Sequence, residues 1–227
     1  MSVQATTTEP RVPLTRERVL RAAIGVADKD GFESVTMRRL GKELGVEAMS
    51  LYNHVANKDE IRDGIVEIVM EEIEVPERAG HWKTAIWASA ISAHDVLLSH
   101  PWACTLMTQA TNVSPARLRW MEGVLGSLRN GGFSAELTHH AYHVLDSHIT
   151  GFTLWQVSFP FETTAELAEL AERFLRELPR DEYPYLAEHI EYHIEEARSP
   201  DDGTGEGEFE FGLHLILDGL ERLRDAG

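Results

Sequence analysis

The chain has 227 residues, of which 43% are apolar and 26% charged, proportions typical of a folded globular protein. Its single cysteine, Cys104, excludes an intrachain disulfide and a zinc site built from several cysteines. No apolar run reaches the ~18 residues that a membrane-spanning helix needs. Residues 1–13 also lack the apolar core of a signal peptide, so we expect a cytoplasmic protein.

The net charge of −17 is distributed unevenly along the chain. Residues 1–58 carry 9 Lys and Arg against 7 Asp and Glu, whereas residues 59–227 carry 12 against 31. The first segment can therefore approach a polyanion such as DNA, which the acidic remainder would repel. An acidic surface that is merely solvated would give the same asymmetry.

Four helices are predicted in the first third of the chain, after an arm (residues 1–12) that we expect to be disordered. Thr15, Thr36 and Asn57 are suitable N-caps, because their side-chain oxygens can accept a hydrogen bond from a free amide of the first turn. Gly31 and Gly45 end the first two helices. The expected helices cover residues 15–29, 36–44, 47–54 and 57–75.

Seven further helices are predicted in the rest of the chain, where prolines separate the apolar periodic segments. No segment alternates as a half-buried strand does, so the fold class is all-α. An N-terminal domain with a helix-turn-helix is expected over residues 13–73 and a C-terminal helical bundle over 74–227. The expected helices cover residues 82–98, 101–109, 115–130, 134–158, 163–178, 181–197 and 208–225, and 199–207 reads as a flexible loop.

The segment 36–58, TMRRLGKELGVEAMSLYNHVANK, carries most of the functional information. A capped helix, a turn with glycine and a second short helix form a helix-turn-helix, whose second helix fits the major groove of DNA. Lysines and arginines around it are placed to meet phosphates. Helix–glycine–helix arrangements also occur in proteins that never bind DNA, so the pattern leaves both interpretations open. The flanking cations are Arg38, Arg39, Lys42 and Lys58.

Residues 13–73 resemble the DNA-binding domain of the tetracycline-repressor (TetR) family, above all in the run GVEAMSLYNHVANKDEI. The likeness continues through HWKTAIWASAISAHDVLLSHPWA, GFSAELTHHAYHVLDSHITGF and EFGLHLILDGLERL, and little of residues 160–205 aligns. The resemblance implies a ligand-responsive repressor that binds a palindromic operator in double-stranded DNA as a homodimer. An effector bound in the C-terminal domain would shift the fourth helix and change the spacing of the two recognition helices.

The resemblance also implies roles for individual residues of the helix-turn-helix. Arg38 would reach a base or a phosphate, and residues 48–50 would face base edges. The base-reading positions differ from those of the tetracycline repressor itself, which argues against a shared operator. For Tyr52 and His54, local packing or capping is the alternative. The complete implied set is Arg38, Ala48, Met49, Ser50, Tyr52, Asn53, His54 and Lys58.

By the same resemblance, the helices over 134–158 and 208–225 would form a four-helix bundle with their copies in a second subunit. The last helix carries an apolar stripe at helical spacing, which fits an intramolecular core as well as a dimer interface. The stripe comprises Leu213, Ile216, Leu217, Leu220 and Leu223.

The effector implied by the resemblance is a small, mainly apolar molecule and not a magnesium–tetracycline chelate. The family's magnesium-ligating histidine aligns with Met107, whose thioether is a poor ligand for magnesium. The drug-contacting Asn and Phe align with Ser89 and Ala93, and a metal-site Glu aligns with Trp155. Aromatic side chains and a few polar anchors would complete the site. The candidate effector contacts are Ser89, Ala93, Trp102, Met107, Tyr142, Asp146, Ser147 and Trp155.

No catalytic or cofactor motif stands out, so we expect neither an enzyme nor a bound cofactor. The pairs His139/His143 and His189/His193 have the i, i+4 spacing that places two imidazoles on one face, but neither pair has an obvious third ligand. We interpret them as surface or pocket-lining histidines and expect no metal site. The alternative function is a helical ligand-binding or adaptor protein whose helix-turn-helix is only structural. Salt-dependent retention on a DNA column distinguishes the two functions.

Overall fold

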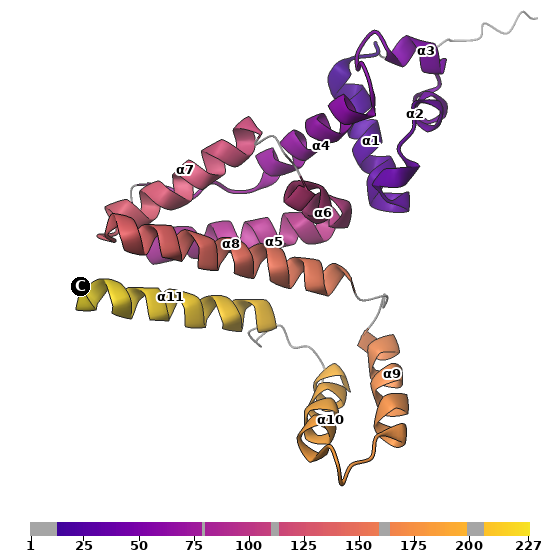
Figure 1. The fold of residues 1–227 in the computed structure, drawn as a ribbon. Coiled ribbons are helices and arrows are strands. Elements are labelled where there is room, and N and C mark those ends of the chain that lie inside the picture. Colours follow the sequence, from indigo (N-terminus) through magenta and orange to yellow (C-terminus); the bar gives the residue numbers. More distant parts are fainter. Residues whose placement is uncertain (1–12, 79, 110–113, 159–163, 199–206) are drawn as a thin grey trace, which may run out of the picture.

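The computed structural model describes residues 13–78, 80–109, 114–158, 164–198 and 207–227 (Figure 1). These residues form eleven α-helices and one short 3-10 turn, with no β-strand among them, which confirms the all-α prediction. The predicted arm 1–12 and all of the predicted loop 199–207 except Gly207 lie outside the described residues.

The N-terminal unit contains α1 (Arg16–Asp30), the 3-10 turn η1 (Phe32–Ser34), α2 (Met37–Leu44), α3 (Ala48–Leu51) and α4 (Lys58–Glu72). The predicted caps are confirmed: Thr15 Oγ1 accepts from the amide of Arg18, Thr36 Oγ1 from that of Arg39, and Asn57 Oδ1 from that of Glu60.

Two N-terminal helices are shorter than predicted. Helix α3 ends at Leu51, and residues 52–54 form a turn. Helix α4 stops at Glu72 because Ile73 is extended (φ −75°, ψ 129°) and Pro76, which cannot continue a helix, follows soon after. The short turn η1 was not predicted.

Seven helices follow, each beginning and ending within three residues of its prediction. They are α5 (Trp82–Ser99), α6 (Pro101–Gln109), α7 (Pro115–Asn130), α8 (Ala135–Val157), α9 (Thr164–Glu177), α10 (Pro184–Arg198) and α11 (Glu208–Ala226).

Helix α5 lies at the centre of the C-terminal body, where it packs against α6, α7, α8 and α11. Helix α4 links the two units, because it packs on α1 at one end and on α6 and α7 at the other. Helices α9 and α10 pack mainly on each other and project away from the rest of the body (Figure 1). The N-terminal unit is therefore joined to the body mainly through α4, with a smaller contact between α1 and α6.

Each unit has a closely packed apolar interior. In the N-terminal unit Leu40, Leu51 and Ile65 are fully buried, and in the body Leu97, Leu128 and Leu213 are. Burial of one such side chain stabilises the fold by about 1.5–3 kcal/mol. The interior residues of α2 and α3 therefore determine which residues of these short helices remain outside.

Candidate nucleic-acid interface and effector domain

Helices α2 and α3 approach each other closely through the glycines of their turn. Gly45 adopts a left-handed conformation (φ 65°, ψ 36°) that favours glycine, and the amide of Val46 donates to the carbonyl of Gly41 at 2.9 Å. A Cβ on Gly41 would lie only 2.9 Å from the carbonyl oxygen of Val46. This geometry forms the helix-turn-helix predicted from the sequence.

Most of the residues expected to contact DNA lie on the outward side of α3 and of the turn that follows it, residues 52–54, and we call this surface the outward face of α3. Because Leu51 and Val55 point into the core, Met49 and Tyr52 point outward, with 76% and 49% of their surfaces exposed. Asn53 is exposed as well, whereas Ser50 and His54 are half-buried. A short helix with such a face has the size and polarity to enter the major groove. Ala48, at the start of α3, is half-buried.

The cations next to this face differ in their partners. Arg38 on α2 is exposed, whereas Arg39 pairs with Asp30 at 2.9 Å. Lys58, the first residue of α4, contacts Glu33 at 3.0 Å and lies over the ring of Phe32. An incoming phosphate would have to compete with Glu33 for Lys58.

The start of α4 is fixed by reciprocal capping. Asn57 accepts from the amide of Glu60, and the carboxylate of Glu60 accepts from the amide of Ala56 at 2.7 Å. Glu60 also pairs with Arg16 of α1 at 3.2 Å. The bond from Ala56 first, and then that from Arg16, holds the pKa of Glu60 below its usual value. These contacts join α4 firmly to α1.

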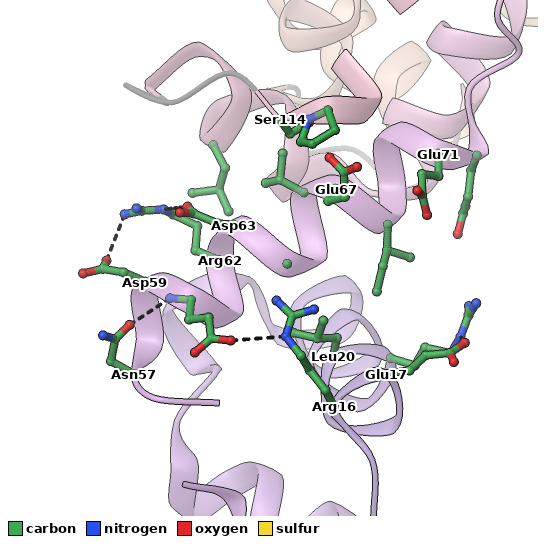
Figure 2. A pocket seen from close by; sticks show the side chains of 18 residues that line it. Arg16, Glu17, Leu20, Asn57, Asp59, Arg62, Asp63, Glu67, Glu71 and Ser114 are labelled. Atoms are coloured by element: carbon green, nitrogen blue, oxygen red, sulfur yellow. Dashed lines mark hydrogen bonds and ion pairs between the residues drawn. The ribbon is translucent and has the colours of Figure 1, made fainter. Parts of the chain in front are cut away.

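A groove of about 1050 Å³ lies between α1, α4 and the beginning of α7, and Figure 2 shows its lining. Most of the side chains in it are charged, and several form ion pairs with one another, such as Arg62 with Asp59 and Asp63. A groove of this polarity does not suit a mainly apolar effector.

Glu67 connects the middle of α4 to helix α7 of the C-terminal body. Both oxygens of its carboxylate accept from the amide of Ala116 in the first turn of α7, at 3.0 and 3.1 Å. Arg119 reaches Glu71 one turn further along α4 at 3.1 Å. The carboxylate of Glu67 therefore occupies the positive end of α7.

The effector candidates on α5 and α6 have different environments. Ser89 is buried, and its hydroxyl donates to the carbonyl of Glu74 at 2.6 Å and accepts from the indole of Trp120 at 3.0 Å. Ala93 is also buried. Met107 is half-buried, and its carbonyl accepts from the guanidinium of Arg117. Trp102 is buried too, but its indole nitrogen donates to Asp28 of α1 at 2.6 Å.

The candidates on α8 divide between its inner and outer faces. Tyr142 is buried, with its ring 6.4 Å from that of Trp120. Burial raises the pKa of Tyr142, with a further contribution from Asp146, which is half-buried. Ser147 and Trp155 are exposed on the outer face.

The structure thus gathers some candidates and separates others. Ser89 and Tyr142 lie together around Trp120, whereas Ser147, Trp155 and Trp102 point elsewhere. Trp120 and Arg117 are not among the effector contacts predicted from the sequence. Helical periodicity reports which face a residue occupies and gives no signal for contacts between separate helices.

An aromatic stack that the sequence did not reveal joins α5, α8 and α11. The ring of Phe209 is nearly parallel to those of His94 and His148, with centroids 3.9 and 4.8 Å away. The hydroxyl of Thr153 donates to a backbone carbonyl, so it accepts from Nδ1 of His94 at 2.7 Å. Burial is the main cause that lowers the pKa of His94.

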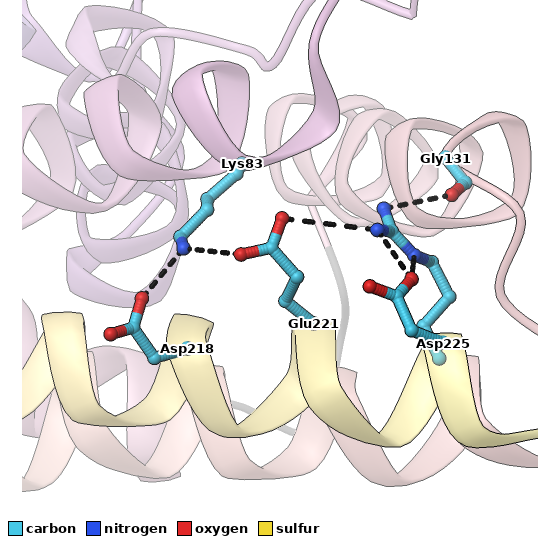
Figure 3. A network of polar contacts seen from close by, with 6 residues as sticks. Lys83, Gly131, Asp218, Glu221 and Asp225 are labelled. Carbon is cyan, nitrogen blue, oxygen red and sulfur yellow. Dashed lines mark hydrogen bonds and ion pairs between the residues drawn. The ribbon is translucent and has the colours of Figure 1, made fainter.

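A polar network holds the other half of α11 against α5 and the α7–α8 turn (Figure 3). Lys83 contacts Asp218 at 2.6 Å and Glu221 at 2.8 Å, and Arg224 donates to the carbonyl of Gly131 at 3.4 Å. Asp218 and then Glu221 raise the pKa of Lys83, and Lys83 lowers that of Asp218. Helix α11 is therefore fixed along its length on the body.

The apolar stripe of the last helix could form part of the core of one chain or part of a dimer interface, and its residues divide between buried and exposed positions. Leu213, Leu217 and Leu220 are buried within the chain, Ile216 is half-buried, and Leu223 is exposed. Leu223 belongs to a second set of apolar side chains, which are exposed on α8 and α11. We call this set the outer face, and it comprises Val144, Trp155, Phe211, Leu215 and Leu223.

The histidine pairs have the side-by-side placement expected from their spacing, with ring centroids 4.7 Å apart in His139/His143 and 4.5 Å apart in His189/His193. Within the described ranges, no group of three or more His, Cys, Asp or Glu is arranged to hold a metal ion. No helix of that part of the chain is long and apolar enough to cross a membrane.

A helix-turn-helix with an exposed polar recognition surface, joined by one helix to a larger helical body, defines a DNA-binding transcriptional regulator. Two family models together match most of the sequence. Residues 19–65 match the bacterial regulatory proteins of the tetR family, and residues 75–224 match the tetracyclin repressor-like C-terminal domain. The chain belongs to the TetR family.

Relatives and solved structures agree with this assignment. The transcriptional repressor DrrR1 of Streptomyces coeruleorubidus is 31% identical, over 94% of this chain and 80% of its own. The class C tetracycline repressor of Escherichia coli is 26% identical, over 93% and 92%. Apo ActR of Streptomyces coelicolor is 29% identical, with a TM-score of 0.72 over 96% of this chain and 99% of that one. ActR in complex with actinorhodin is 30% identical, with a TM-score of 0.69 over 94% and 99%.

Proposed function

We propose that this ligand-responsive repressor binds an inverted-repeat operator as a two-fold symmetric dimer and is released by a small, mainly apolar effector. The observation that carries the proposal is the outward face of α3, where Met49, Tyr52 and Asn53 are exposed beside Arg38 and Lys58. Such a protein acts on DNA in the cytoplasm and needs no enzymatic activity.

The two kinds of DNA contact are assigned to different residues. Ala48, Met49 and Ser50 read base edges, and Tyr52, Asn53, His54 and Lys58 contact the backbone or nearby bases. Arg38 reaches a base or a phosphate. In the dimer the two copies of α3 lie about one DNA turn apart, ~34–36 Å.

The outer face of α8 and α11 is the dimer interface in this proposal. Large side chains such as Trp155, Phe211 and Leu215 are more than half exposed, although the opposite side of the same helices is buried in the body. An apolar helix surface of this kind gains stability when a second surface covers it. Ser147 and Trp155 would then face the second subunit.

The proposed effector is a small, mainly apolar molecule, aromatic in part, with one or two hydrogen-bonding groups. Support comes from Ser89 and Tyr142, which lie buried around Trp120 inside the body. ActR, which is similar to this chain over nearly its whole length, is described in complex with actinorhodin. A methionine at position 107 offers magnesium no hard oxygen or imidazole ligand, which argues against a metal–drug chelate.

The test begins with DNA fragments selected by the purified protein from a random pool. The expected product is an inverted repeat that is bound with strong salt dependence, and light scattering at micromolar concentration is expected to show a dimer. Sequence-independent DNA retention, or none, would favour the alternative of an adaptor with a structural helix-turn-helix. A monomer would contradict the proposed interface.

Two probes then test the effector class on the selected duplex. We expect actinorhodin, the molecule in complex with ActR, to release the duplex at micromolar concentration and to quench tryptophan fluorescence. Tetracycline with magnesium serves as the contrasting probe and should leave the complex intact. Magnesium-dependent release by tetracycline would overturn the assignment of Met107.

A further inference from the structure

A second connection between the two units runs through α1, apart from the covalent link through α4. Two aromatic side chains meet Asp28 on α1: His100 from the turn between α5 and α6, and Trp102 from the first turn of α6. Both side chains are largely buried. The two aromatic side chains therefore lie inside the junction between the N-terminal unit and the body, whereas Asp28 lies at its edge, with 31% of its side-chain surface exposed.

Asp28 accepts two hydrogen bonds on a single carboxylate oxygen. The indole nitrogen of Trp102 donates to Oδ1 at 2.6 Å, and Nδ1 of His100 lies 2.7 Å from the same atom. A carboxylate only accepts, so Nδ1 of His100 carries a hydrogen in this arrangement. Hydrogen bonds to an ionised acceptor are among the stronger ones, particularly where water is excluded.

The other side of the His100 ring faces α4. Its Nε2 lies 3.4 Å from Oε2 of Glu72, the last residue of that helix. The rings of His100 and Trp102 are 6.0 Å apart and tilted edge to face, so each limits the movement of the other. One imidazole thus contacts both helices by which the DNA-binding unit meets the body.

Both donors, His100 and Trp102, lie at the start of α6. Helix α6 begins at Pro101, between His100 and Trp102, so a displacement of its first turn moves both donors. Because Asp28 lies in the last turn of α1, it can follow them only if the whole DNA-binding unit turns. A rotation that separates them would leave a buried indole nitrogen without its acceptor, which is costly.

We propose that Asp28 is a positioning residue for operator binding, which holds the DNA-binding unit at one angle on the effector domain through His100 and Trp102. The inference rests on the proposed function for its consequence, because the spacing of two recognition helices depends on that angle. The angle itself is a property of one chain and can be measured without DNA.

The first experiment measures the angle within one chain by pulsed electron paramagnetic resonance. Spin labels are attached at Glu43→Cys on α2 and Leu118→Cys on α7, both exposed positions, in a Cys104→Ser background diluted with unlabelled protein. We expect Asp28→Ala to broaden or shift the label-to-label distance distribution. Asp28→Asn keeps an acceptor oxygen and should restore most of the parent distribution.

Asp30→Ala is the matched control. Asp30 lies on the same helix with a similar side-chain exposure (35% against 31% for Asp28), but its partner Arg39 belongs to the DNA-binding unit itself. The control should keep the parent distance distribution. A parent-like distribution in Asp28→Ala, or an equal change in Asp30→Ala, would overturn the proposal.

The second measurement is affinity for the selected duplex, with thermal unfolding recorded in parallel. We expect Asp28→Ala to bind on the order of tenfold more weakly, as the loss of charge-assisted hydrogen bonds implies. A parent protein that binds no duplex would contradict the proposed function and leave the distance test of Asp28 intact. If Asp28→Ala fails to fold, Trp102→Phe removes one donor and should produce the same shift in smaller measure, whereas a parent-like distribution there would refute the role.

Discussion

The N-terminal unit and the C-terminal body use their apolar residues differently. In the N-terminal unit Leu40, Leu51 and Val55 are buried, and α3 presents Met49 and Tyr52 among polar groups. In the body, α8 and α11 are apolar on the side that faces α5 and also on their outer face. A helix that is apolar on two sides has two surfaces to cover. The contrast separates a surface suited to nucleic acid from one suited to protein.

The largest expected effect is on dimerisation, when a charge is introduced into the outer face. Leu215→Glu would place a charge in the proposed dimer interface, where it would be desolvated without a partner. We expect at least about a hundredfold rise in the dimer dissociation constant, consistent with the cost of an unpaired charge, and a matching loss of operator binding. Analytical ultracentrifugation measures the first and electrophoretic mobility the second.

The control for this change lies elsewhere on the body. Leu118→Glu on α7 alters an equally exposed leucine that is not part of the outer face. It should leave the protein dimeric. A dimeric Leu215→Glu would show that α8 and α11 do not form the interface.

The cationic side of the N-terminal unit gives the next effect. Lys58→Ala should weaken binding by about tenfold for all sequences and reduce the salt slope by about one unit, as expected for one lost phosphate contact. Met49→Ala, at the same surface, should instead change preference at particular base pairs. Unchanged affinity and salt slope in Lys58→Ala would place the phosphate contact elsewhere.

A pH dependence should arise in the body from buried His94. Its pKa is lowered in the folded protein, mainly by burial, whereas an unfolded histidine titrates near 6.5. Below about pH 6.5 the unfolded chain binds a proton that the folded chain does not, so this contribution to stability is present at higher pH and is lost as the pH falls. Its slope is at most about 1.4 kcal/mol per pH unit.

Denaturant unfolding between pH 7 and 5 measures this dependence. His94→Asn should reduce the slope of the unfolding free energy against pH. His140→Asn is the control, because His140 is exposed on α8, and its slope should match the parent. Equal slopes in all three proteins would mean that His94 takes up its proton as readily in the folded chain.

The smallest expected effect is an increase in operator affinity. Glu33→Gln removes the carboxylate that pairs with Lys58, and Glu33 is 94% exposed, so the pair contributes little stability. Freed from this partner, Lys58 should bind phosphate more readily, and operator affinity should rise about twofold. Glu17→Gln breaks another exposed pair of the same unit, with Arg21, and should leave affinity unchanged. A lower affinity in Glu33→Gln would show that Glu33 assists Lys58.

Local chemistry explains why the helices could be predicted so closely. Thr15, Thr36 and Asn57 cap their helices with hydrogen bonds to the residue three positions further on. The start of each helix can therefore be predicted from a few consecutive residues. The outward face of α3 followed from the same local pattern. Helix α3 was predicted too long, because residues 52–54 form a turn and do not continue the helix.

Contacts between distant segments could not be predicted in the same way. Asp28 and Trp102 are 74 positions apart, and neither has a local feature that points to the other. The stripe of α11 was equally ambiguous, because helical spacing is the same for a core and for an interface. Leu217 is buried and Leu223 exposed, a division that depends on where α5 and α8 lie.

Gly64 allows α4 to pack closely against α1, the helix that carries the rest of the DNA-binding unit. A Cβ on Gly64 of α4 would lie 2.8 Å from the side chain of Leu20 on α1, so these helices touch with no space for even a methyl group. The ion pair between Arg16 and Glu60 lies at the same interface, so α1 and α4 are joined by both close packing and a polar contact. We therefore expect a displacement of α4 at the end that contacts the body to move α1 with it, and with α1 the helices α2 and α3 that pack on it in turn.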